Sequence, residues 1–340
     1  MSTLQVIGID LGKSNFHVYA LDSNPKASFK KHFSRKQLIE FLTLQSPTVV
    51  AFEACGGAHW LARKCQDMGH TAKLIPPQYV KPYVKTNKND FVDAEAITEA
   101  ATRHNMRFVS PKTEDQQIIA VCHRVRDGYV KERTAVMSRI GATLLEFGLS
   151  LPTGHKCMKE LFFWIARQTH LTLPPLLMRE LELMHSDYLR LNTQISEQDR
   201  KLKEWAKQEE LCELVKSIPG VGDMVATALV MEVGDARQFK NGRGMAAWMG
   251  LVPKQYSTGG KQKLLGISKR GNKTLRCLFV HGARAIMSRL GRNSGPYDAW
   301  LLKLRESKPF NVVCIALANK LARMAWAVLT TRTPFRGTAC

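Results

Sequence analysis

Leu4-Gln5-Val6-Ile7-Gly8-Ile9-Asp10 is an apolar run of strand length, and Phe16-His17-Val18-Tyr19-Ala20-Leu21-Asp22 is a second. The residues between them, Leu11-Gly12-Lys13-Ser14-Asn15, are a short connection containing Gly and Asn, which predicts a β-hairpin. A third strand is expected over residues 27–33, and Ser34 is suited to cap the helix that follows. The chain therefore begins with a three-stranded meander.

The next segment alternates helix and strand signals. Thr48–Ala54 is a buried apolar run with Glu53 near its end, and a helix is expected over residues 59–68. Thr71–Ile75 is predicted to form another strand, which Pro76-Pro77 stops. A meander followed by alternating helices and strands predicts a mixed α/β sheet.

The helical period dominates from about Asp93 onward, and residues 113–148 and 176–208 are predicted to form long helices. Apolar residues in the second helix recur at steps of four and three, with the last one heptad later: Leu177, Leu181, Met184, Tyr188, Leu191, Ile195 and Leu202. This spacing fits a coiled-coil or antiparallel helical arm, and equally a plain helix that faces a core.

At 340 residues the chain is long enough for two or three domains. We assign residues 1–112 to an α/β domain, 113–210 to a helical arm and 211–335 to a mainly helical domain. The predicted fold class is thus α/β plus α.

Charge, cysteine content and apolar runs indicate the compartment and argue against a zinc site and a membrane partner. The net charge is +21 and the pI is about 9.8, which exceeds what solubility requires. The eight cysteines include no Cys-x-x-Cys pair, which argues against a zinc site and for reduced thiols. No signal peptide is recognised, and no apolar run approaches the ~18 residues of a membrane span. We expect a cytoplasmic, nucleoid-associated bacterial protein without a membrane partner.

The positive charge is concentrated near the C-terminal end. From Ala236 to Tyr297 the chain contains thirteen Lys or Arg and no Asp or Glu. Such a stretch repels itself unless a polyanion neutralises it, which indicates nucleic acid as the partner. A membrane surface would instead favour a basic amphipathic helix, whereas these cations lie mostly in Gly-rich segments.

The N-terminal part carries isolated carboxylates. Asp10 ends the first strand and Glu53 ends a later one, so both can face the crevice at the carboxyl edge of the sheet. Asp90 and Asp93 are three residues apart and share a helix face. Clustered carboxylates repel one another unless cations neutralise them, and oxygen ligands suit Mg²⁺ or Mn²⁺. Two such ions about 3.5–4 Å apart are suited to phosphodiester chemistry.

Parts of this pattern also fit structures without a metal site. Asp90 can be a helix N-cap with Asp93 as its acidic N3 residue. Residues 7–12 also resemble the phosphate loop of actin-like sugar kinases and ATPases, although the second phosphate loop and the adenosine motif of those proteins are not found. As a set, the four carboxylates look like those of RuvC-type resolvases of the ribonuclease-H-like fold.

Residues 217–226 predict a helix, a tight glycine turn and a second helix, which is the helix-hairpin-helix signature. Backbone N–H groups near Gly220 and Gly222 can bind a phosphate without reading bases, although a tight turn with no ligand has the same signature. Downstream cations are predicted to neutralise phosphate charge: Lys254, Lys261, Lys263, Lys269, Arg270, Lys273 and Arg276.

Ser257 and Thr258 are expected in a loop, followed by Gly259 and Gly260, which permit close backbone approach to a ligand. A hydroxyl there can act as a nucleophile on phosphorus or can simply contact a phosphate, and composition favours the contact. Ser268 is a competing hydroxyl.

The motifs occur in a characteristic order. The N-terminal ones are Gly8-Ile9-Asp10, Phe52-Glu53-Ala54 and Lys88-Asn89-Asp90-Phe91-Val92-Asp93-Ala94. The downstream ones are Ile218-Pro219-Gly220-Val221-Gly222, Gly250-Leu251-Val252-Pro253, Ser257-Thr258-Gly259-Gly260-Lys261, and Ile267-Ser268-Lys269-Arg270-Gly271-Asn272 with Leu275-Arg276. Over nearly the whole chain this set resembles the DEDD-type insertion-sequence transposases, which are related to the Piv DNA invertases.

The resemblance implies a RuvC-like N-terminal domain, a helical arm used in assembly and a C-terminal transposase domain. It implies that the four carboxylates hold Mg²⁺ or Mn²⁺, and that Ser257 attacks the DNA backbone to form a transient phosphoserine link. Members of the family are described as using an element-encoded structured RNA that pairs with donor and target DNA. A guide RNA is therefore an expected partner beside DNA, and base pairing would read the sequence.

The leading hypothesis is a recombinase that moves its own insertion element as a homodimer or homotetramer. The alternatives are a RuvC-type junction endonuclease without a covalent intermediate, a site-specific DNA invertase, and a non-catalytic nucleic-acid-binding protein. Thr258 can take the place of Ser257 as the nucleophile. The acidic and serine sites can meet within one chain or across a subunit interface.

Overall fold

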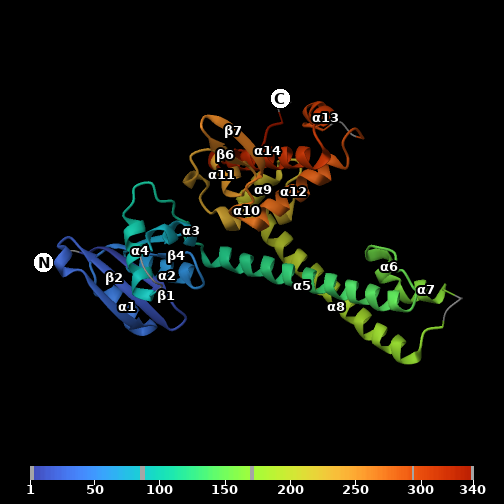
Figure 1. Ribbon diagram of the computed structural model, residues 1–340, viewed down its shortest axis with the longest axis horizontal. Coiled ribbons are helices and arrows are strands. Elements are labelled where there is room, and N and C mark those ends of the chain that lie inside the picture. The colour runs from blue at the N-terminus through green and yellow to red at the C-terminus, as the bar shows by residue number, and fades with distance from the viewer. Residues whose placement is uncertain (1–3, 85–88, 169–171, 293–294, 338–340) are drawn as a thin grey trace. The chain divides into compact units, whose positions relative to one another are not determined.

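The computed structural model describes residues 4–84, 89–168, 172–292 and 295–337 (Figure 1). Lys88, the first residue of the motif that contains Asp90 and Asp93, lies outside these residues. The chain divides into two compact units, Met1–Asp115 and Gln116–Cys340. The division into three parts at residues 112 and 210 stays a prediction.

The first unit is built on a five-stranded sheet. Its strands are β1 (Leu4–Leu11), β2 (Asn15–Asp22), β3 (Phe29–Ser34), β4 (Val49–Glu53) and β5 (Thr71–Ile75), in the spatial order β3-β2-β1-β4-β5. The first three strands are antiparallel neighbours, whereas β4 and β5 run parallel to β1. The predicted mixed α/β sheet is confirmed, and its arrangement is compatible with a ribonuclease-H-like domain.

Side chains along each strand alternate between the two faces of this sheet, and different helices cover each face. Helices α1 (Arg35–Thr43) and α2 (Ala58–Asp67) pack with Ile7 and Ile9 in one hydrophobic cluster. Helix α4 (Asp90–Ala101) packs with Val6 in another cluster, on the opposite face. The short helix α3 (Pro77–Val80) and the 3₁₀ turns Pro25–Ala27 and Lys81–Tyr83 complete the unit.

Gly8 allows α4 to lie very close to β1. A Cβ at this position would be 1.9 Å from Thr98 Oγ1 and 2.5 Å from the carbonyl oxygen of Ala94. No side chain fits into that space, because real Cβ contacts are well beyond 3 Å. Gly8, two residues before Asp10, therefore sets the height of α4 above the sheet.

The second unit contains an antiparallel pair of long helices, α5 (Glu114–Glu146) and α8 (Pro175–Gln208), with α6 (His155–Lys159) and α7 (Leu161–Ala166) between them in sequence. Arg126 pairs with Asp199, and Arg133 Nη1 donates to Asn192 Oδ1 at 2.8 Å. Leu181, Tyr188 and Leu191 of the heptad pattern are buried in a cluster with residues of α5.

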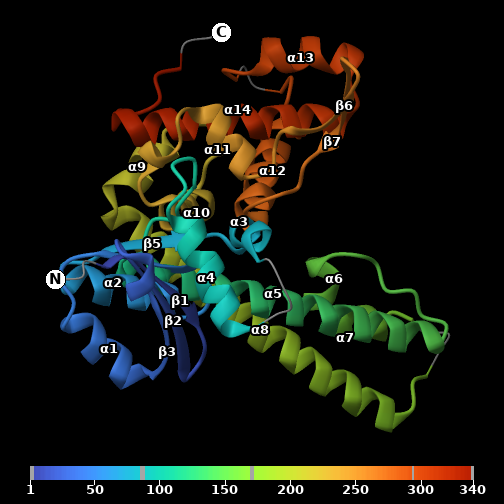
Figure 2. The same ribbon diagram turned by 60° about the vertical axis from the view of Figure 1, so that its left-hand side comes forward.

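The rest of this unit is a helical core that carries one hairpin (Figure 2). The helices are α9 (Glu210–Lys216), α10 (Asp223–Val233), α11 (Gly242–Trp248), α12 (Lys273–Met287), α13 (Asp298–Ser307) and α14 (Phe310–Thr331), with a 3₁₀ turn at Ala236–Gln238. The hairpin pairs β6 (Pro253–Thr258) with β7 (Lys261–Ile267). The expectation that Ser257 and Thr258 lie in a loop is wrong, because both end a paired strand.

The expectation that no apolar run approaches the length of a membrane span is wrong for helix α14. Among the described residues, α14 is long and apolar enough to cross a membrane by length and composition, and half of its most apolar 18-residue stretch is buried in the protein. Val313, Leu317 and Leu321 form a stripe that packs into the helical core. This position in the core accounts for the apolar composition of the helix.

Candidate active site and nucleic-acid interface

Strand register places three polar side chains on the face of the sheet that α4 covers. Ile9 and Phe52 are register partners on parallel strands, and both belong to the cluster beneath α1 and α2. The residues that follow them, Asp10 and Glu53, therefore point to the opposite face. His17 is the register partner of Asp10 across the β1–β2 hairpin and shares that face.

The first turn of α4 supplies the other two predicted carboxylates. Asn89 is the N-cap, and its side chain accepts a hydrogen bond from Phe91 N at 3.0 Å. The alternative in which Asp90 caps the helix is wrong, because Asp90 is the first helical residue. Asp90 lies on the same helical stripe as the buried Ala94, and Asp93 is one turn further along.

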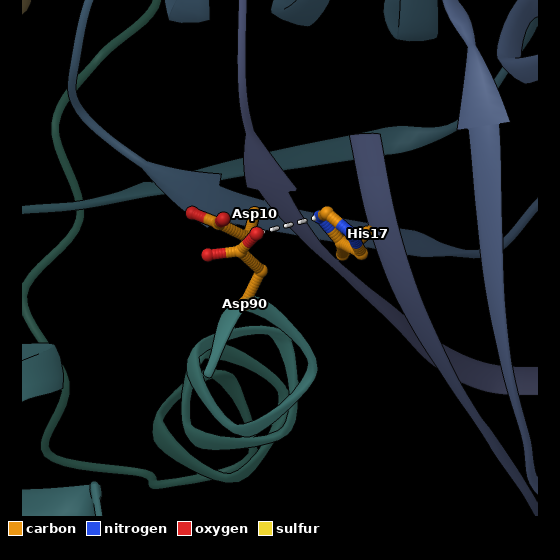
Figure 3. A group of neighbouring side chains, drawn as sticks. All are labelled: Asp10, His17 and Asp90. Carbon is orange, nitrogen blue, oxygen red and sulfur yellow. Dashed lines mark ion pairs between the residues drawn. The ribbon is translucent and has the colours of Figure 1, made fainter. Parts of the chain in front are cut away.

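Asp10, His17 and Asp90 come together from three different elements (Figure 3). Their possible ligand atoms all lie within 4.8 Å of one another. His17 Nδ1 is 3.5 Å from Asp90 Oδ2, and the His17 ring packs edge-on against Phe91 with centroids 4.8 Å apart. His17 was not among the residues predicted from the sequence. Its register opposite Asp10 was the signal that could have identified it.

Glu53 and Asp93 lie outside this closest group. Glu53 and Asp10 both act on the thiol of Cys55. Burial is the main cause that raises the pKa of this thiol, and the negative charges of Glu53 and then Asp10 raise it further. Both carboxylates therefore act on the same small region at the end of β4. Asp93 is half-buried one helical turn after Asp90.

The donor set fits a hard divalent cation. Asp10 is half-buried, and the Asp90 side chain is 60% exposed, so a cation held between them could also contact a substrate. Carboxylate oxygens suit Mg²⁺ and Mn²⁺, whereas imidazole nitrogen is a poor ligand for Mg²⁺. With Mg²⁺, His17 would serve as the hydrogen-bond partner that orients Asp90.

The β6–β7 hairpin presents the predicted serine. Gly259 and Gly260 form its two-residue turn with φ of 54° and 76°, the left-handed conformation that a type I′ turn requires. A Cβ at either glycine would meet no atom within 4 Å. Turn geometry therefore explains these glycines, and they need no ligand that approaches the backbone.

The two hydroxyls of the hairpin point to opposite faces. Ser257 shares its face with Gln255, whose Nε2 donates to Ser257 Oγ at 3.0 Å. The register pairs Tyr256 with Lys263 and Thr258 with Lys261, so the other face carries Tyr256, Thr258, Lys261 and Lys263. These two lysines accordingly flank Thr258 rather than Ser257.

The loop after β7 is locked against the end of α11. A Cβ at Gly271 would be 1.8 Å from the carbonyl oxygen of Trp248, and one at Gly250 would be 2.2 Å from that of Arg270. Lys269 N donates to the carbonyl oxygen of Gly250 at 3.2 Å. The two glycine motifs interlock, and the side chains of Lys269 and Arg270 remain exposed.

The other predicted nucleic-acid contacts differ in exposure. Six cations are exposed: Lys254, Lys261, Lys263, Lys269, Arg270 and Lys273. Arg276 is half-buried, and its Nη1 donates to the carbonyl oxygen of Met249 at 2.9 Å. The guanidinium of Arg276 therefore supports the loop, and its contact with nucleic acid stays a prediction.

The helix-hairpin-helix turn connects α9 to α10. Gly220 has a φ of 93°, and a Cβ there would be 2.6 Å from Ile286 Cδ1 of α12. Packing on α12 thus explains this glycine. Gly222 is exposed at the N-cap of α10, where its backbone is accessible to a phosphate.

Comparisons with known proteins match this chain to transposases and, at lower identity, to a gene-inverting protein. A model of DEDD-type IS110 transposases matches residues 7–148, and a model described as "Transposase IS116/IS110/IS902 family" matches residues 212–297. The transposase for insertion sequence element IS1328 of Yersinia enterocolitica is 46% identical over 98% of this chain and 99% of its own length. The transposase for insertion sequence element IS1111A of Coxiella burnetii is 40% identical over 99% and 92%. The pilin gene-inverting protein of Moraxella lacunata is 23% identical over 97% of both chains.

Proposed function

The chain belongs to the IS116/IS110/IS902 family of transposases and is a DNA transposase of an insertion sequence, and from this premise we propose a two-site mechanism. In this proposal, Asp10, Glu53, Asp90 and Asp93 form a metal-dependent site in a ribonuclease-H-like domain. Ser257 is the nucleophile that breaks the DNA backbone. Membership of a transposase family argues against the non-catalytic alternative.

The observation that carries the proposal is the convergence of Asp10, His17 and Asp90 from two strands and a helix. The close approach of α4 over Gly8 supports it, because this contact fixes the height of Asp90 above the sheet. A divalent cation at this site would neutralise phosphate charge and promote attack on phosphorus. The role of His17 is to hold the Asp90 carboxylate through Nδ1.

The serine step follows from ordinary phosphoryl transfer. Ser257 Oγ attacks phosphorus, its proton passes to solvent, and the bond to one DNA oxygen breaks. One end of the broken strand takes up a proton from solvent and leaves as a hydroxyl, while the other end stays linked to Ser257 as a phosphodiester. A hydroxyl of a second DNA end then attacks the same phosphorus and releases the serine. The hydrogen bond from Gln255 holds Oγ in place and leaves the hydroxyl proton free to depart.

Thr258 is the competing nucleophile in this scheme. Lys261 and Lys263 share its face and could neutralise a phosphate placed there. Ser257 has one methyl group less and so hinders attack less, which is why we assign the reaction to it. On this assignment the lysine face binds the DNA backbone beside the cleaved phosphate.

Partners and assembly complete the proposal. The acid-free stretch from Ala236 to Tyr297 and the exposed cations on the hairpin support binding of DNA, and equally of a structured guide RNA. Two DNA ends and a target must be held together, so we propose a homodimer or homotetramer. A guide RNA would read sequence by pairing while the protein holds backbones.

A second outcome of the same chemistry is DNA inversion. The full-length similarity to the Moraxella lacunata pilin gene-inverting protein favours it, at 23% identity. The outcome would then depend on how the two recombining sites are oriented. The 46% identity to an insertion-sequence transposase places transposition first.

The experiment is to trap the covalent intermediate. Full-length protein is mixed with Mg²⁺, DNA that spans the element ends and RNA transcribed from the flanking noncoding region, then digested and mapped by mass spectrometry. We expect one nucleotide on Ser257. The matched variants are Ser257→Ala, Thr258→Val and Ser268→Ala, of which only the first should abolish the adduct.

The alternative results have distinct meanings. A nucleotide on Thr258 or Ser268 would move the nucleophile while keeping the recombinase. Cleaved DNA without an adduct, unchanged in Ser257→Ala, would support the RuvC-type endonuclease instead. Full activity of Asp10→Asn would contradict the acidic site.

A further inference from the structure

The second unit contains a cavity that has no part in the proposed reaction. Its volume is about 810 Å³, within the usual range of small-molecule sites. It is lined by the start of α11, by α13 and α14, and by the residues after α14. Helix α14 contacts both α11 and α13 (Figure 2).

Cations without carboxylate partners line this cavity. Arg243, Lys320 and Arg323 contribute to its wall, whereas the described lining residues include no Asp or Glu. None of these three cations takes part in an ion pair between described residues. Lys320 Nζ lies 4.7 Å from the centroid of the Trp300 ring, which also lines the cavity. The positive charge of the wall is therefore available to an anion.

Aromatic rings form much of the remaining wall. Trp326 Nε1 donates to the carbonyl oxygen of Ala236 at 3.1 Å, which fixes the orientation of its indole. Tyr297 also lines the cavity, is 3% exposed, and has a hydroxyl without a hydrogen-bond partner among the described residues. Burial raises the pKa of Tyr297 to about 12, so the hydroxyl keeps its proton within the wall of the cavity.

One ligand class matches planar rings and unpaired cations together. A nucleobase stacks on aromatic rings, its polar edge accepts hydrogen bonds, and its phosphate binds cations. A base inside a duplex is stacked and paired, so it cannot enter a cavity of this kind without leaving the helix. A nucleotide that fits this cavity is therefore an unpaired one.

We propose that this cavity binds one unpaired nucleotide of the nucleic acid on which the enzyme acts, with the base near Trp300 and Tyr297 and the phosphate on Arg243 and Arg323. The inference rests on the proposed function, because that function brings nucleic acid to this unit. It adds a site at which the protein holds a single-stranded residue. The nucleotide can come from DNA or from RNA, which share this chemistry.

The test measures binding by the full-length protein without metal, so catalysis is not needed. The probes are duplexes with one bulged nucleotide and the same duplexes with an abasic bulge, each made in DNA and in RNA. We expect the abasic probe to bind about tenfold more weakly, as the loss of one stacked base predicts. Trp300→Leu should remove this difference.

Charge variants provide the matched control. Arg243→Gln with Arg323→Gln should weaken binding of the bulged probe more than Arg289→Gln with Lys303→Gln, which removes the same charge from exposed positions outside the cavity. A bulged 4-thiothymidine or 4-thiouridine should crosslink to Tyr297, Trp300 or residues of α14. Thermal melting of each variant verifies its fold.

The outcomes separate this site from the proposed function. A base preference in DNA, in RNA or in both supports the site and identifies the source of the nucleotide. A preference that persists in Trp300→Leu, or crosslinks found only outside the cavity, overturns the site, and an adduct on Ser257 would then leave the proposed function intact. Absence of nucleic-acid binding at low salt would overturn both.

Discussion

His17 Nδ1 lies 3.5 Å from Asp90 Oδ2, so the second strand of the sheet contacts the first turn of α4. The contact joins two segments that are far apart in sequence. Asp10, the register partner of His17, lies beside both of them (Figure 3). The acidic site is thus assembled by the β1–β2 hairpin and by the position of α4, and each of these can be tested separately.

Replacing His17 should weaken metal binding without removing a carboxylate. For His17→Ala we expect Mn²⁺ affinity to fall by about 10- to 100-fold, because partners that orient ligands have effects of this size. Isothermal titration calorimetry on the full-length protein measures it. His32→Ala is the control, since the His32 ring is 5.1 Å from that of His17 but lies outside the closest group. Equal affinities in all three proteins would contradict the role of His17.

Asp10→Asn should separate charge repulsion from metal binding. In the absence of metal we expect the variant to melt at or above the temperature of the wild type, because one of several clustered negative charges is removed. Adding Mn²⁺ should raise the melting temperature of the wild type but not that of Asp10→Asn. Differential scanning fluorimetry gives both comparisons. The same metal-induced shift in both proteins would refute a cation site at Asp10.

Gly8→Val should be severely destabilising. Its side chain would occupy space held by Thr98 and by the backbone of Ala94, so α4 must move away from the sheet. We expect a loss of about 3 kcal/mol or more in the free energy of unfolding, measured by urea titration. Gly128→Ala on α5 is the control, because no atom lies within 4 Å of a Cβ there. That change should stabilise the protein by about 0.5–1 kcal/mol.

His123 should make the second unit sensitive to acid. It is buried, its Nε2 lies 3.0 Å from Thr227 Oγ1, and burial is the main cause that lowers its pKa to about 4. Thr227 Oγ1 donates to the carbonyl oxygen of Asp223 at 2.8 Å, so His123 is the donor of the pair. Between pH 6.5 and 4 the unfolded chain binds more protons than the folded one. Stability is therefore full above about pH 6.5 and declines as the pH falls toward 4.

The corresponding measurement compares unfolding at pH 8 and pH 5. The single shift of His123 predicts a loss of about 2 kcal/mol over this interval. His123→Gln keeps a donor near Thr227 but does not titrate, so its loss should be smaller by about that amount. The same substitution at the exposed His281 serves as the control. If His123→Gln keeps the full pH dependence, another group is responsible.

The sequence alone was sufficient for the strands of the first unit and for the two long helices of the second. Alternating apolar residues predict the strands, and Ser34 predicts the start of α1, where Gln37 N donates to Ser34 Oγ and Ser34 N to Gln37 Oε1. The long helices follow from helical periodicity. These features depend on residues that are close together in the chain, so a local pattern contains the necessary information.

The sequence was less informative where two segments meet. It placed Ser257 and Thr258 in a loop, because the Gly259-Gly260 turn with lysines and glycines around it has the composition of one. Only the pairing of β6 with β7 shows that the two hydroxyls point to opposite faces and that Lys261 and Lys263 lie with Thr258. A shift of register by one residue would exchange these faces, and no single strand encodes its register.

The sequence by itself determined the family, the positions of four carboxylates and the one-sided charge of the C-terminal region, since each is a property of residue identity and spacing. Only the tertiary structure decided that His17 joins Asp10 and Asp90, that Gly8 lies beneath Thr98, and that a cavity with cations and indoles lies beside α14. The physical reason is packing. Which side chains share a face and how closely two backbones approach depend on contacts between distant segments, and such contacts exist only in the folded chain.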